Sequence, residues 1–190
     1  MTSDYLRYYD LESYLFEEVH PRFHREGKLG AFDFFTIIIW KANRAKSTIA
    51  HRLVKEHPDL KGLEAISQTF TSQLFEAESA EDRIRLAIKD WRFRLPMASA
   101  ILTVLWPDEF TVFDVRVYGE LSNPDEFKDL RDVDPNNYSD RIWKAYVAYR
   151  EAVKVEVEQY RCLRDKDRFL WGRSAARQLS EDIERAFVKA

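Results

Sequence analysis

Asp114 is the residue of this chain whose surroundings point most clearly to chemistry. It follows an apolar run, residues 97–106, that Pro107 ends, and it stands directly before Val115–Val117, where we expect another helix to begin. A carboxylate at a helix N-terminus stays ionised because the free N–H groups and the helix dipole favour negative charge. Such a carboxylate can stabilise positive charge on a substrate or deprotonate a water molecule. Helix capping alone is the alternative explanation, because Asp is among the commonest N-cap residues.

The elements around Asp114 are expected to be helices, as in most of the chain. Pro96 suits the first turn of a helix, where its missing N–H costs nothing, and the apolar residues after it predict the central core helix. Only 5 Gly and 6 Pro interrupt 190 residues, so we expect an all-α fold. Further helices are predicted over residues 4–18, 32–43, 47–58, 63–74, 79–89 and 140–160, with a short one over 167–171 and a last one after 180.

Composition limits the classes of protein and of cofactor. Hydrophobic residues make up 45% of the chain and charged residues 33%, which is typical of a protein with a core and a solvated surface. No secretory signal or membrane span is recognisable, so we expect a cytoplasmic location and no membrane partner. Cys162 is the single cysteine and cannot hold an iron–sulfur cluster. His20 and His24 are four residues apart, but we expect Pro21 to interrupt the helix between them. No metal or other cofactor is therefore expected.

The charge is unevenly distributed around a net value of −3. Residues 41–55 carry five Lys or Arg and no acid, and residues 161–177 carry six Lys or Arg against two acids. Residues 107–134 carry nine acids against three bases. Two basic segments that converge in space could hold a phosphate backbone, whereas charge alone favours ordinary solvated helix faces.

The central block resembles the helix–hairpin–helix DNA glycosylase superfamily. That family has Leu-Pro-Gly-Val-Gly-x-Lys-Thr-Ala, then an apolar helix, then Val-Asp-Thr-His or a related segment. Met97–Ala100 matches the start of the apolar helix, and Phe113–Val117 matches the segment that holds the catalytic Asp. The chain is more similar still to a group of uncharacterised bacterial proteins related to that superfamily, in which Trp-Lys precedes the block and Leu-Trp follows it. Trp40-Lys41 and Leu170-Trp171 stand in the same order here.

The resemblance implies a fold and an activity. The fold would be one domain, residues 1–190, with two helical lobes and a cleft between them. Residues 59–121 would form the hairpin-bearing lobe, and residues 1–58 with 122–190 the second lobe. The activity would be removal of a damaged or modified base from double-stranded DNA, with Asp114 as the catalytic carboxylate and the base flipped into the cleft. The substrate could be damage in the cell's own DNA or a deliberately modified base in foreign DNA.

Two departures from the family pattern bear on mechanism. Arg92 and Arg94 occupy the places of the hairpin glycines, so guanidinium groups rather than close backbone amides would hold a DNA phosphate. Pro96 occupies the place of the lysine that lyase-competent members use as a nucleophile. Because a Schiff base needs an amine, the resemblance implies a monofunctional glycosylase that leaves an abasic site without a strand nick.

Further site residues are expected from the same resemblance. Trp40 and Trp171 are candidates to stack on the flipped base, Lys41 to contact a phosphate or a pocket carboxylate, and Asn43 to fill the gap left in the duplex. Core positions for the tryptophans, a solvent-facing Lys41 and a helix C-cap at Asn43 are the alternatives. The candidate DNA-contacting residues, each of which could also be an ordinary surface cation, are Arg44, Lys46, Arg92, Arg94 and Arg116.

Two other functions are compatible with the sequence. A relative of the glycosylases that only binds DNA would also lack the hairpin glycines and the lysine, and its DNA binding would not depend on Asp114. A helical interaction protein with no nucleic-acid role is favoured by the acidic net charge. No protein partner is implied by any motif.

Overall fold

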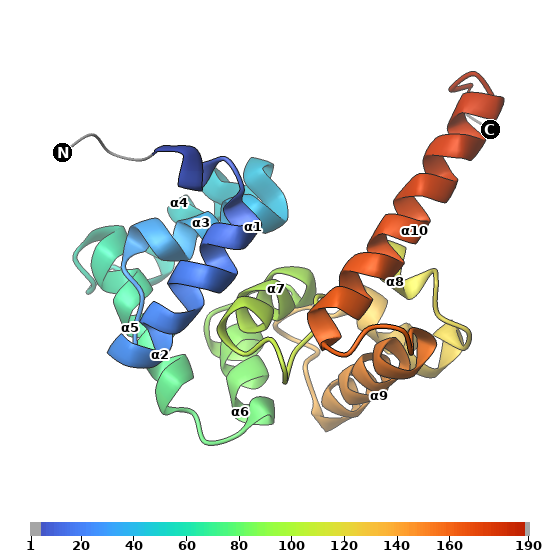
Figure 1. Cartoon of the computed structure of the whole chain (residues 1–190). Coiled ribbons are helices and arrows are strands. Elements are labelled where there is room, and N and C mark those ends of the chain that lie inside the picture. Colours follow the sequence, from blue (N-terminus) through green and yellow to red (C-terminus); the bar gives the residue numbers. More distant parts are fainter. Residues whose placement is uncertain (1–4, 189–190) are drawn as a thin grey trace.

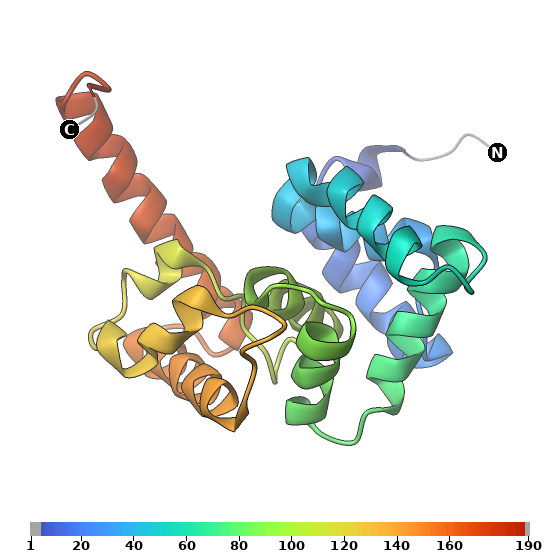
Figure 2. The same cartoon turned by 180° about the vertical axis from the view of Figure 1, so that it is seen from behind.

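The computed structural model describes residues 5–188, and these residues form helices and connecting loops without a strand (Figures 1 and 2). The expected all-α class is confirmed. No helix among the described residues is both long and apolar enough to cross a membrane. Short 3₁₀ segments at Tyr5–Tyr8 (η1) and Asn43–Ala45 (η3) join the larger elements.

The N-terminal segment is helical past Pro21, contrary to expectation. Helix α1 (Leu11–Tyr14) continues through a π turn, η2 (Leu15–Val19), into α2 (His20–Glu26). Proline lacks the N–H for a regular helical bond and its ring crowds the preceding turn. The wider π turn, in which the His20 N–H donates to the Leu15 carbonyl, directly precedes it. The rings of His20 and His24 consequently lie 4.6 Å apart, and both contact carbonyl groups at the end of α7 (Leu95–Leu105).

Helix α3 carries two of the candidate site residues at its C-terminal end. It spans Ala31–Ala42 and packs against α4 (Lys46–Glu56), α5 (Gly62–Glu76) and α7. Phe34, Ile37 and Ile38 are fully buried. The prediction of a buried helix over residues 32–43 is confirmed. β-branched and aromatic residues dominate this segment, yet it is helical, because its apolar face is covered on several sides.

A turn between two helices precedes the site. Helix α6 (Ala80–Arg85), capped by the Ser79 hydroxyl, runs into the π turn η4 (Leu86–Asp90). After four intervening residues the central helix α7 (Leu95–Leu105) begins, with Pro96 in its first turn as predicted. Arg92, within this turn, has a φ of 55°, in the left-handed region that favours glycine. Nearly every residue of α7 is buried, which makes it the centre of the core.

The C-terminal part consists of α8 (Val115–Tyr118), the 3₁₀ segment η5 (Pro124–Asp132), α9 (Asp140–Glu156) and α10 (Leu163–Glu184). The expectation of two separate helices after residue 160 is wrong. Helix α10 continues through Gly172 and Ser180 and contains no proline. Arg173 and Arg177 pair with the buried Glu120 and fix the middle of α10 beside α8. Its final turns extend away from the rest of the molecule (Figure 1).

Helix α7 lies between the two ends of the chain. Helices α1 to α5 occupy one side of it and α8 to α10 the other in both views (Figures 1 and 2). The two sides meet where Glu12 of α1 pairs with Arg164 and Arg168 of α10. The predicted assignment of residues to two lobes stays a prediction.

Candidate functional site

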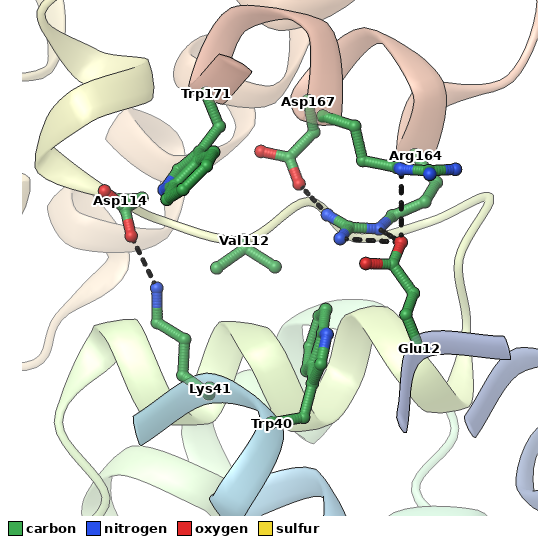
Figure 3. A pocket seen from close by; sticks show the side chains of 9 residues that line it. Glu12, Trp40, Lys41, Val112, Asp114, Arg164, Asp167 and Trp171 are labelled. Atoms are coloured by element: carbon green, nitrogen blue, oxygen red, sulfur yellow. Dashed lines mark hydrogen bonds and ion pairs between the residues drawn. The ribbon is translucent and has the colours of Figure 1, made fainter. Parts of the chain in front are cut away.

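A pocket of about 410 Å³ lies where the N-terminal helices, the loop before α8 and α10 come together (Figure 3). Helix α10 contributes one face, since its lining residues are spaced three or four apart. The residues that line the pocket are Glu12, Trp40, Lys41, Val112, Asp114, Arg164, Asp167, Arg168 and Trp171.

Asp114 is both the N-cap of α8 and part of the pocket wall. Its Oδ1 accepts a hydrogen bond of 3.0 Å from the backbone N–H of Arg116. Its Oδ2 lies 2.7 Å from Nζ of Lys41, at the end of α3. The two side chains are only 22% and 16% exposed, so this ion pair is largely shielded from solvent. Capping and a place in the pocket therefore occur in the same residue.

The surroundings of Asp114 favour its charged form. Burial raises the pKa of this carboxyl, but the charge of Lys41 and the hydrogen bonds from Lys41 and the Arg116 backbone outweigh burial and leave the pKa below its ordinary value. Asp114 is thus an ionised carboxylate near neutral pH. It is suited to stabilising a cation or to holding a water molecule.

A second carboxylate, Asp167, faces the same pocket from α10. It is 3% exposed, and Arg164 donates a hydrogen bond to its Oδ2. Arg164 also donates through Nε and Nη2 to Oε1 of Glu12, at 3.2 and 3.0 Å. One guanidinium is therefore shared between two carboxylates. The other oxygen of Asp167 is turned toward the Trp171 side of the pocket (Figure 3).

Burial sets the ionisation of Asp167 apart from that of Asp114. Burial raises the pKa of Asp167 to about 6 and the negative charge of Asp114 adds to the rise, whereas Arg164 and Lys41 oppose it. The pocket therefore holds one carboxyl group whose pKa is lowered and another whose pKa is raised. Such a divergence is common where one group must be ionised and another must carry a proton.

The two candidate stacking residues both line the pocket, from different elements. Trp40 packs edge-on against Phe16 and lies 5.0 Å below the guanidinium carbon of Arg164. Trp171, on α10, is 44% exposed, and the guanidinium of Arg116 lies 5.0 Å from its ring centre. Figure 3 shows the tryptophans on opposite sides of the pocket. Trp171 thus offers accessible aromatic surface, and Trp40 is part of the wall.

The remaining predicted residues lie outside the pocket lining. Asn43 follows α3 and is exposed, and its side chain accepts a 2.5 Å hydrogen bond from Lys46. Arg44 and Arg94 are exposed. Arg92 lies 3.5 Å from Glu56. The structure therefore brings together Trp40, Lys41, Asp114 and Trp171, with Arg116 beside them, and leaves the other five apart from this group.

Sequence reasoning missed Asp167, Arg164 and Glu12. The predicted break within residues 161–180 concealed the fact that Arg164, Asp167 and Trp171 recur on one face of a single helix. A spacing of three and then four residues was the available signal. Glu12 gave no signal, because its partner lies 152 residues away in the sequence.

Comparisons with known proteins give no assignment, since no family model, curated protein or solved structure matches the chain. Within residues 5–188, no three His, Cys, Asp or Glu side chains are grouped so that they could hold a metal ion. The site must therefore be interpreted from its own geometry.

Proposed function

We propose that this chain is a DNA glycosylase that hydrolyses the N-glycosidic bond of a damaged or modified base, with Asp114 as the catalytic carboxylate. The observation that carries the proposal is the position of Asp114, ionised and paired with Lys41, in the wall of a pocket that also holds Trp40 and Trp171. The resemblance of the chain to the helix–hairpin–helix glycosylases predicts the same aspartate as the catalytic residue.

The chemistry of base removal matches what Asp114 can supply. As the bond between C1′ and the base nitrogen breaks, positive charge develops on the deoxyribose, and a nearby carboxylate stabilises that charge. The same carboxylate can orient the water that attacks C1′. Lys41 keeps Asp114 ionised in the free protein.

The pocket is suited to an extruded base. Enzymes that act on a base within a duplex turn it out of the stack into a pocket with aromatic walls and polar groups that contact its edge. Trp171 supplies exposed aromatic surface, while Asp167 and Arg164 supply an acceptor and a donor. A pocket of about 410 Å³ falls within the range of small-ligand sites.

Contacts with the DNA backbone are proposed for the turn before α7 and for Arg116. Arg92 adopts a left-handed φ at a place where the glycosylase hairpin has glycine, so the backbone there follows a conformation that glycine would favour. Arg94, at the N-cap of α7, is exposed, and no ion pair of its side chain is found among the described residues. These cations would hold phosphates without reading sequence.

The test is abasic-site formation on a panel of duplex DNAs that carry damaged or modified bases. Asp114→Asn keeps a good N-cap but removes the charge. We expect the wild-type protein to release a base and Asp114→Asn to lose that activity. Asp10→Asn is the matched control, because Asp10 caps α1 and lies outside this pocket. If no DNA in the panel loses a base while wild type and Asp114→Asn bind DNA equally, the chain is a binding relative and the proposal is wrong.

A further inference from the structure

Three carboxylates are buried in the described part of the chain, and Asp167 is the one among them that lines the pocket. Asp33, the other fully buried Asp, is paired with Arg22 and accepts a hydrogen bond from Tyr14 at 2.6 Å, outside the pocket. Buried Glu120 is held by Arg173 and Arg177. Asp33 and Glu120 thus each have two side-chain partners, whereas one side chain, Arg164, contacts Asp167.

The contacts of Asp167 compensate its charge only in part. Within residues 5–188, Arg164 is the one hydrogen-bond donor to Asp167, and the same guanidinium directs two of its nitrogens to Glu12. A buried carboxylate normally requires a dedicated partner, because removal from water is costly. A partly compensated carboxyl group readily takes up a proton, and the protonated group becomes a hydrogen-bond donor.

The charged and titratable groups that face Asp167 come from every element packed around it. Lys41 projects from α3, Asp114 from the loop before α8, and Arg164 from α10 itself. Tyr146 and Tyr149 of α9 are fully buried and feel its charge. Neither tyrosine hydroxyl donates to Asp167, because that of Tyr146 donates to the carbonyl of residue 111 and that of Tyr149 to the carbonyl of residue 112.

We propose that Asp167, which faces the pocket from α10, is the proton donor to the departing base. This inference rests on the proposed function. The bond between C1′ and the base nitrogen breaks, and its electron pair goes to the base. The Asp167 carboxyl transfers its proton to a base nitrogen, so that a neutral base leaves. Water then bonds to C1′ and gives a proton to Asp114 or solvent, and Asp167 regains a proton from solvent. The products are the free base and an abasic sugar.

The division of roles defines a substrate class. A neutral base is a poor leaving group and gains from protonation, whereas a base that already carries a positive charge leaves without it. The pocket therefore fits a neutral base with an accessible acceptor nitrogen better than it fits a cationic alkylated purine.

The test is the pH dependence of single-turnover base release, measured for the neutral base that the wild-type protein releases fastest. We expect the wild-type rate to fall as pH rises above about 6, where Asp167 loses its proton. Asp167→Asn should lose about 100-fold in rate, the lower end of general-acid effects, and should lack this limb of the profile. Asp165→Asn is the matched control, since Asp165 lies on the same helix but outside the pocket.

A second arm separates catalysis from structure. N7-methylguanine in DNA is a cationic leaving group, so any release of it should survive in Asp167→Asn and be lost in Asp114→Asn. The inference is overturned if Asp167→Asn retains the wild-type pH profile, or if its rates of release of the two bases fall by equal factors. If the wild-type protein releases neither base, the proposed function fails, and this inference fails with it.

Discussion

The ammonium group of Lys41 lies 2.7 Å from the carboxylate of Asp114, joining two residues that are 73 positions apart in the sequence. This contact links the end of α3 to the N-terminus of α8 at one side of the pocket (Figure 3). It explains why a half-buried carboxylate stays ionised. It also places the one lysine of the pocket where its charge is already used.

The ion pair should contribute to stability in a pH-dependent way. Lys41→Met leaves Asp114 unpaired, and we expect a loss of about 1–3 kcal/mol in the free energy of unfolding at neutral pH. Because the folded pKa of Asp114 is lowered, its stabilising contribution is present above its unfolded pKa and is lost as pH falls through the folded pKa. The difference between the two proteins should therefore shrink in acid.

Urea denaturation at several pH values measures this difference. Lys46→Met serves as the control, because Lys46 is exposed and its ammonium group donates a hydrogen bond to the side chain of Asn43. Equal losses for the two variants would contradict a specific role for the Lys41–Asp114 pair.

Strand cleavage should be absent. Pro96 offers no amine, and Nζ of Lys41 is engaged by the Asp114 carboxylate at 2.7 Å, so we expect neither residue to form a Schiff base with an abasic sugar. Borohydride treatment of the protein with abasic DNA should trap no covalent complex, and the DNA should remain unnicked. A trapped complex that disappears in Lys41→Met would refute the monofunctional mechanism.

Trp171 should contribute to binding of an extruded base but not to folding. Its ring is 44% exposed. Stacking on an aromatic side chain contributes about 1–3 kcal/mol per base, so Trp171→Ala should weaken binding of DNA with a flipped base by roughly tenfold or more. Trp171→Phe should restore part of the affinity. Leu179→Ala, at an exposed apolar position of the same helix, should bind as wild type does. Fluorescence anisotropy at fixed salt measures these affinities.

Arg94 and Arg116 should act through phosphates. Replacing either by Ala should weaken DNA binding to all sequences alike and reduce the slope of log affinity against log salt by about one. Arg141→Ala is a suitable comparison, because Arg141 is exposed but paired with Asp129 at a distance of 2.6 Å. A salt slope that is the same in all four proteins would exclude these two arginines from the DNA interface.

The free energy of unfolding that Asp167 contributes, relative to Asp167→Asn, should be larger in mild acid than near neutral pH. Its folded pKa is raised to about 6, so the folded state holds a proton that the unfolded state releases between the two pKa values. Its contribution is complete below the unfolded pKa and is lost as pH rises through about 6. The effect is of order 1–3 kcal/mol at about 1.4 kcal/mol per pKa unit. Thermal unfolding of both proteins at about pH 5 and pH 7 is the measurement. A constant difference would contradict the raised pKa.

Local patterns were sufficient for the parts of the fold that depend on short stretches. The scarcity of Gly and Pro predicted helices, and Pro96 and Ser79 marked helix starts that the structure confirms. The predicted interruption of the helix at Pro21 was wrong, because a π turn beside it keeps the helix continuous, and no sequence rule predicts that adjustment. The continuity of α10 was missed for a similar reason, since its packing beside α8 and its pairing with Glu120 are long-range contacts.

The site was predicted in part. Trp40, Lys41, Asp114 and Trp171 were chosen from a resemblance, and the structure groups all four in one pocket. Asp167 could not be singled out, because its burial depends on how α10 packs against α3, α9 and the loop before α8. Whether an acidic residue is a surface group or a buried one is decided by tertiary structure, which local charge counts do not report.

The most direct test of the central claim is mass spectrometry of the products in water enriched in heavy oxygen. We expect a free intact base and one heavy oxygen on the abasic sugar, both produced by wild type and Asp10→Asn and both absent with Asp114→Asn. Base release that continues undiminished in a folded Asp114→Asn protein, or heavy oxygen found on the base instead of the sugar, would contradict it.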